Sequence, residues 1–137
     1  KQICIKRIGI KAKIYIYIQT VWDYKMTITR KFNILIYPGL HARPGSEFVK
    51  LCQSYKSSVT IEVDGKTANG KSLLSLFKIE PKQFAVINVS VEGEDEIELI
   101  DKLESWETEA YRNKEDFDND QVNEELLKTF EVIFDNE

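Results

Sequence analysis

The chain has 137 residues, a formal net charge of −4 and a single histidine, and this length fits one domain with extensions rather than two full cores. The mildly acidic balance argues against general nucleic-acid binding, because that function requires a basic face that displaces counterions from phosphates. With one histidine and two distant cysteines, Cys4 and Cys52, neither a Cys/His zinc set nor a disulfide framework is expected, and the cysteine usage indicates a reducing, cytoplasmic compartment.

Charge is distributed unevenly along the chain. Residues 1–25 carry a net charge of +5, residues 26–106 are nearly neutral and residues 107–137 carry a net charge of −8. We therefore expect an N-terminal extension, a central domain and an acidic C-terminal tail. The extension lacks both an unbroken span of about 18 apolar residues and a signal-peptide core, so no membrane insertion is expected. Because Met26 is the sole methionine, our interpretation is that the natural domain begins there and that residues 1–25 are either an upstream extension or not native.

The apolar pattern becomes regular after Met26. Apolar residues alternate with polar ones over residues 32–36, which predicts a strand that ends at Pro38. A helix is predicted over residues 42–55, where apolar side chains recur at helical spacing and Pro44 is suited to the first turn.

A hairpin and a short helix are predicted next. Residues 59–63 alternate as a second strand, the dipeptide Asp64-Gly65 is typical of a tight hairpin turn, and residues 66–69 form a third strand. Residues 72–79 predict an apolar helix of about two turns. A short helix of this kind is by itself more typical of a core cap than of a partner-binding surface.

A fourth strand and a third helix complete the predicted domain. Residues 85–91 alternate as a strand, and residues 95–106 form a helix in which Ile97, Ile100 and Leu103 are expected to point inward. The order β-α-β-β-α-β-α predicts an α+β open-faced sandwich, in which a four-stranded antiparallel sheet carries three helices on one face.

The acidic tail contains one further apolar pattern. Val122, Leu126, Phe130 and Ile133 lie near one helical face, and Asp120 precedes them as a helix cap. The pattern is compatible with an amphipathic helix that docks on this domain or on a partner, and equally with a mostly solvated tail.

The only histidine lies in the run PGLHARPGSEF, residues 38–48. His41 directly precedes a predicted helix start, where free backbone N–H groups and the helix dipole favour an anion such as phosphate. Arg43 adds a planar cationic group that matches phosphate oxygens, and imidazole is a competent nucleophile near neutral pH. These features predict a phosphoryl acceptor. Because the chain has no nucleotide-binding motif, no cofactor is expected and the phosphoryl group would come from a partner protein.

Two motifs then indicate a family. The run GLHARPGS, residues 39–46, resembles the active-histidine motif of HPr, the histidine-containing phosphocarrier of the bacterial phosphoenolpyruvate:sugar phosphotransferase system (PTS). The run GKTANGKSLL, residues 65–74, is similar to the serine motif of the same family, at the spacing of the family. The resemblance covers residues 26–106 and implies the HPr-like fold described above.

The resemblance also implies roles for individual residues. His41 would accept phosphate from enzyme I and donate it to enzyme IIA domains of sugar transporters, while Arg43 steadies the phosphoryl group. Ser72 would be the regulatory serine phosphorylated by HPr kinase/phosphorylase where that enzyme exists. The partner-binding surface would comprise Lys71, Leu73, Leu74 and Phe77. The protein would then be a monomeric phosphoryl carrier rather than a stand-alone catalyst, without metal or cofactor.

Pro38 departs from the family pattern. It stands where family members often have a small polar residue, and proline offers neither a hydroxyl nor an N–H group, so an altered transfer rate is expected.

Two alternative functions remain open. The first alternative is a regulatory paralogue that serves carbon or nitrogen control without feeding a transporter. The second is a binding module that acts through its tail and is not phosphorylated on His41.

Overall fold

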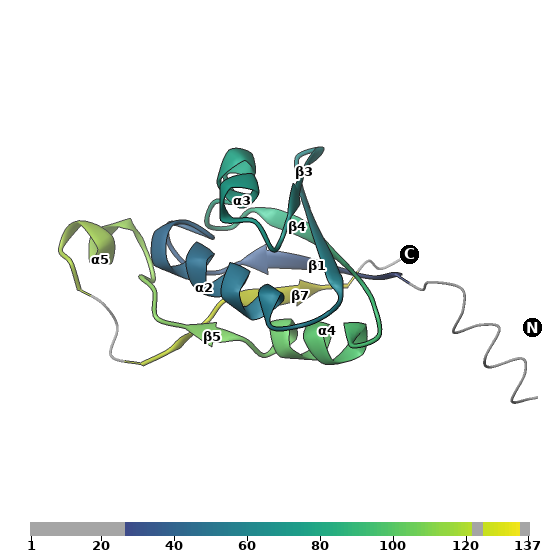
Figure 1. Cartoon of the computed structure of the whole chain (residues 1–137). Helices are drawn as coiled ribbons and strands as arrows, with labels where there is room; N and C mark the ends of the chain where they lie inside the picture. The colour runs from purple at the N-terminus through teal and green to yellow at the C-terminus, as the bar shows by residue number, and fades with distance from the viewer. Residues whose placement is uncertain (1–26, 122–124, 135–137) are drawn as a thin grey trace, which may run out of the picture.

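A computed structural model describes residues 27–121 and 125–134 of the chain (Figure 1). The expectations for the N-terminal extension and for Met26 lie outside these residues. The helices and strands that the described residues form, in chain order, are β1 (Thr27–Ile34), α2 (Ala42–Gln53), β2 (Ser58–Val63), β3 (Lys66–Asn69), α3 (Leu73–Ile79), β4 (Val86–Glu92), α4 (Glu96–Glu104), β5 (Glu107–Thr108), α5 (Lys114–Asp118), β6 (Leu127–Lys128) and β7 (Phe130–Ile133).

The main sheet is antiparallel and has the strand order β3-β2-β4-β1-β7. Its register places Phe32 opposite Ile87 and Ile61 opposite Val89, and all four side chains are buried. Because alternate residues of a strand point to opposite faces, this register gathers the apolar side chains on one face of the sheet. The helices α2, α3 and α4 lie on that face (Figure 1), which confirms the predicted open-faced α+β fold.

The hairpin between β2 and β3 forms at the predicted dipeptide. Asp64 and Gly65 both have positive φ angles, 50° and 78°, as a two-residue turn between twisted antiparallel strands requires. The turn brings Val63 opposite Lys66 and continues the pairing as far as Thr60 and Asn69. The local sequence alone therefore determined this part of the sheet.

The tail differs from the helix that its apolar spacing allowed. Residues 127–133 form the strands β6 and β7, and β7 pairs with β1 as a fifth strand of the main sheet. The helix prediction is wrong for these residues, because β1 is otherwise an edge whose backbone groups need partners, and pairing with it buries Phe130 completely. Residues 122–124, which carried the start of the predicted helix, lie outside the described residues.

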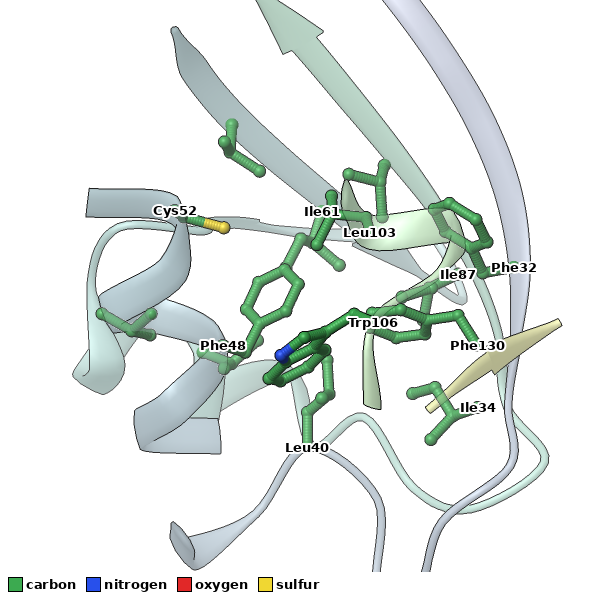
Figure 2. Packing of buried hydrophobic residues seen from close by; sticks show 14 of the residues in the cluster. Phe32, Ile34, Leu40, Phe48, Cys52, Ile61, Ile87, Leu103, Trp106 and Phe130 are labelled. Atoms are coloured by element: carbon green, nitrogen blue, oxygen red, sulfur yellow. The ribbon is translucent and has the colours of Figure 1, made fainter. Parts of the chain in front are cut away.

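Four aromatic rings form the centre of the core. Trp106 lies 5.9 Å from Phe48 and 5.8 Å from Phe130 between ring centroids, and Phe130 also stacks on Phe32 at 5.1 Å (Figure 2). The tail thus contributes a central residue of the core rather than a solvated appendage. Helix α4 packs Leu99, Ile100 and Leu103 inward, whereas Ile97 is 59% exposed, so the inward orientation predicted for Ile97 is wrong.

Candidate functional site

The start of α2 positions His41. His41 is the N-cap residue, with extended backbone angles of φ −118° and ψ 159°, and its carbonyl accepts a hydrogen bond from the Gly45 N–H at 3.4 Å. The N–H groups of Ala42 and Arg43 precede Gly45, the first intrahelical donor, and have no acceptor within the helix, while Pro44 has no N–H. The predicted nucleophile therefore lies at the positive end of a 12-residue helix, as the sequence indicated.

The loop before His41 is held by the segment that leads into β4. The Leu40 N–H donates to the Pro81 carbonyl at 2.9 Å, and the Gln83 N–H donates to the Pro38 carbonyl at 3.1 Å. Gly39 has a φ angle of 118°, and a Cβ atom at this position would lie 2.1 Å from the Pro81 carbonyl oxygen. Only glycine therefore permits this close approach, which fixes the chain just before His41. Pro38 itself follows a cis peptide bond from Tyr37.

Helix α3 lies beside His41. The rings of His41 and Phe77 are nearly parallel, with an interplanar angle of 15° and a centroid distance of 6.2 Å. A Cβ atom added at Gly45 would lie 3.2 Å from the Phe77 ring, so the glycine of the histidine motif makes room for the helix of the serine motif. The fold thus packs the histidine motif against the helix that follows the serine motif.

The serine motif begins α3. Ser72 is the N-cap residue, and its Oγ accepts a hydrogen bond from the Ser75 N–H at 3.2 Å. Phe77 lies five residues further along the helix, which corresponds to about 7.5 Å of axial rise. The two predicted phosphorylation residues therefore lie near opposite ends of α3: Ser72 caps its start, and His41, from the start of α2, lies beside its last turn.

The predicted partner-binding residues differ in exposure. Leu74 is 69% exposed and Phe77 is 36% exposed, whereas Leu73 packs partly against the core. The Lys71 ammonium donates to the Tyr55 carbonyl at 2.7 Å, just beyond the end of α2. Leu74 and Phe77 thus form the accessible apolar part of this surface, and Lys71 links the start of α3 to the end of α2.

Arg43 has a partner that the sequence reasoning missed. Its guanidinium forms an ion pair with the Glu109 carboxylate at 2.9 Å, between side chains that are 70% and 49% exposed. The high acidity of the tail was the only signal for this contact in the sequence. Nothing in the local pattern indicated which acidic residue would reach Arg43.

The tail segment around Glu109 also contacts the loop that leads to His41. The Tyr37 N–H donates to the Tyr111 carbonyl at 2.9 Å, and the Gln83 side chain donates to the Arg112 carbonyl at 2.7 Å. The Phe117 ring packs against those of Tyr37 and Tyr111, at 5.5 and 5.2 Å. The tail is therefore joined to the site by hydrogen bonds and aromatic packing as well as by charge.

Other chemistry finds little support in the described part of the chain. Burial raises the pKa of the Cys52 thiol to about 12, so this cysteine is a core residue and not a nucleophile. Among residues 27–121 and 125–134, no group of three or more His, Cys, Asp or Glu side chains is placed to hold a metal ion. No helix in the same ranges has the length and apolar character needed to cross a membrane.

Comparisons with known proteins agree on one family. The sequence pattern of the family described as "PTS HPr component phosphorylation site" matches residues 28–107. The phosphocarrier protein HPr of Borreliella burgdorferi is 44% identical over 72 residues, which cover 50% of this chain and 84% of the relative. The HPr-like protein Crh of Bacillus subtilis is 32% identical over 79 residues, which cover 58% of this chain and 93% of the relative.

A solved structure shows the same fold. The phosphocarrier protein HPr from Bacillus anthracis superposes with a TM-score of 0.54 at 28% sequence identity, and the match covers 55% of this chain and 89% of that protein. The matched family region ends at residue 107. The tail strand β7 and the segment around Glu109 therefore lie beyond the part that defines the family.

Proposed function

The chain belongs to the HPr family of PTS phosphocarrier proteins, and from that premise we propose that His41 is the residue that carries the phosphoryl group. In this proposal enzyme I, charged from phosphoenolpyruvate, is the donor, and enzyme IIA domains are the acceptors. The protein acts in the cytoplasm as a monomer. It carries the group between two partners and completes no reaction alone.

The chemistry follows from the position of His41. A ring nitrogen forms a bond to phosphorus as the bond between phosphorus and the donor breaks, and the reverse exchange delivers the group to the acceptor. The N-terminus of α2 and the Arg43 guanidinium stabilise the added negative charge. A helix terminus at an exposed site contributes only about 0.3–1 kcal/mol, so the phosphoryl group stays transferable.

The packing of His41 beside Phe77 is the observation that carries the proposal. A carrier must present its nucleophile within the surface that its partners bind. The stacked rings, at a centroid distance of 6.2 Å, place His41 next to the exposed Phe77, and the exposed Leu74 lies three residues earlier on the same helix. A histidine that merely filled the core would lie away from such a surface.

Ser72 is proposed as a regulatory phosphorylation site. Its phosphate would add a charge of about −1.5 to −2 at the start of α3, close to the apolar residues that partners contact. Acidic partner surfaces would then dock less readily, and an HPr kinase/phosphorylase would control this charge. Labelling by that kinase and ATP should disappear in Ser72→Ala, and labelling that persists would refute the assignment.

Phosphorylation of the full chain by enzyme I and labelled phosphoenolpyruvate tests the main proposal. We expect an acid-labile, alkali-stable label on the wild type and none on His41→Ala. A wild-type chain that takes up no label would contradict the carrier function and favour a binding module that acts through its tail.

A regulatory paralogue is the second candidate function. The similarity to the HPr-like protein Crh, at 32% identity, supports it. The presence of His41 argues against those variants of the family that lack the histidine and act only through the serine. Transfer of the label from His41 to an enzyme IIA domain would favour the transport role, whereas a label that stays on the chain would favour regulation.

A further inference from the structure

The Arg43–Glu109 ion pair joins the histidine site to the tail. Arg43 belongs to the first turn of α2, two residues after the N-cap residue His41, and its guanidinium lies 2.9 Å from the Glu109 carboxylate. Glu109 lies beyond the residues that match the family. The contact is therefore a property of this chain that the family pattern does not include.

The fold holds the backbone of Glu109 in place on both sides. On one side, Thr108 is buried and pairs with Leu127 of β6. On the other side, Ala110 is buried and the Tyr111 carbonyl accepts the Tyr37 N–H. Two buried neighbours and a backbone bond to the site loop hold Glu109 on the outer face of its segment, where its side chain reaches Arg43.

A carboxylate and a phosphoryl group bind a guanidinium in the same way. Both present two or more anionic oxygens that match the planar fork of the arginine, and both are attracted by its permanent charge. The guanidinium carries a single positive charge to share between the two groups, and two anions beside it repel each other. Glu109 and a phosphoryl group on His41 would therefore compete for Arg43.

We propose that Glu109 is a positioning residue that holds Arg43 in the unphosphorylated protein and gives it up when His41 is phosphorylated. The proposal rests on the proposed role of His41. Because Arg43 must first leave Glu109, its net binding to the phosphoryl group is weaker than it would be without Glu109. The phosphohistidine is therefore less stabilised and transfers its phosphoryl group to an acceptor more readily. Because the pair is largely exposed, the effect is modest, at most about fivefold in an equilibrium constant.

The phosphorylation equilibrium of the full chain tests this role. With enzyme I and a fixed ratio of phosphoenolpyruvate to pyruvate, Glu109→Gln should shift the equilibrium towards phosphorylated His41 by about two- to fivefold. Glu109→Asp, which keeps the charge, should stay closer to the wild type than Glu109→Gln. The matched control is Glu107→Gln, which removes the same charge from another exposed residue of the segment and should leave the equilibrium unchanged.

An Arg43→Ala background shows whether Glu109 acts through Arg43. There, Glu109→Gln should no longer change the equilibrium, because the guanidinium for which the two anions compete is gone. A shift of the same size in that background would mean that Glu109 merely repels the phosphoryl group, and it would overturn the proposal. A shift in Glu107→Gln equal to that in Glu109→Gln would also overturn it.

A titration with inorganic phosphate gives a readout that needs no enzyme I. The Arg43 Nε–H resonance should respond to phosphate at about two- to fivefold lower concentration in Glu109→Gln than in the wild type. If phosphate titrates the wild type and Glu109→Gln equally, and if their phosphorylation equilibria are equal, the role of Glu109 is refuted and the role proposed for His41 still stands. A wild-type chain that enzyme I does not label at all would instead refute the role proposed for His41.

Discussion

Replacing Phe130 with alanine is expected to destabilise the domain by about 3–5 kcal/mol, although the residue lies in an acidic tail beyond the family region. Phe130 is completely buried, and its ring lies 5.1 Å from Phe32 and 5.9 Å from Phe48. Transfer of such a side chain from water contributes about 1.5–3 kcal/mol, and the cavity left among three packed rings adds to the loss. The strand β7 would also lose the side chain that fixes it to the core.

Urea unfolding of the full chain, followed by tryptophan fluorescence, measures this loss. Trp106 packs directly against Phe130 at 5.8 Å and therefore reports on the same part of the core. Phe134→Ala is the matched control, because Phe134 follows β7 but is 80% exposed, and its free energy of unfolding should stay within about 0.5 kcal/mol of the wild type. A Phe130→Ala variant that loses less than about 1 kcal/mol would show that the tail is not part of the cooperative core.

Three further predictions concern the loop before His41, the start of α4 and the proposed partner surface. Gly39→Ala should cost at least about 2 kcal/mol in the free energy of unfolding, because a positive φ angle and a clash with the Pro81 carbonyl both oppose a Cβ atom; a neutral result in urea unfolding would contradict this close approach. The Ser57 hydroxyl and the Lys56 and Ser57 N–H groups lower the pKa of the Asp95 carboxyl to about 2. Because this value is below the unfolded pKa of about 3.9, the stabilisation is present above pH 4 and is lost as the pH falls towards 2. In Asp95→Asn, the free energy of unfolding should therefore fall less steeply between pH 4 and pH 2 than in the wild type. An unchanged slope in this pH range would refute the assignment. Leu74→Ala should leave the free energy of unfolding within about 0.5 kcal/mol, since the side chain is 69% exposed, but should raise the KM of enzyme I for this protein; an unchanged KM would remove Leu74 from the partner surface.

The local sequence was sufficient for the elements of the central domain. Alternating apolar residues identified the inward faces of β1, β2 and β4, and Asp64-Gly65 identified the hairpin turn, because strand periodicity and turn chemistry act over a few neighbouring residues. Ser72 also caps α3 as its residue type allowed. These features needed no knowledge of distant parts of the chain.

The site was only partly predictable. The histidine motif placed His41 and Arg43 at a helix start, and the structure agrees. The stacking of His41 on Phe77 depends on how α3 packs against α2, which neither motif specifies by itself. The prediction that Ile97 points inward was wrong for a similar reason. Helical spacing is compatible with more than one buried face, and packing against the sheet buries Leu99 instead.

The tail shows most clearly what the tertiary structure decides. Its apolar residues fit a helical face in isolation, but the open edge of β1 and the aromatic core select a strand and bury Phe130. The pairing of Thr108 with Leu127 and the hydrogen bond from the Tyr37 N–H to the Tyr111 carbonyl hold the segment of Glu109 beside Arg43, a residue far away in the sequence. The sequence by itself therefore determined the local elements and the candidate nucleophile. Contacts between residues that are distant in the sequence depend on how the whole chain packs, and no short sequence pattern specifies them.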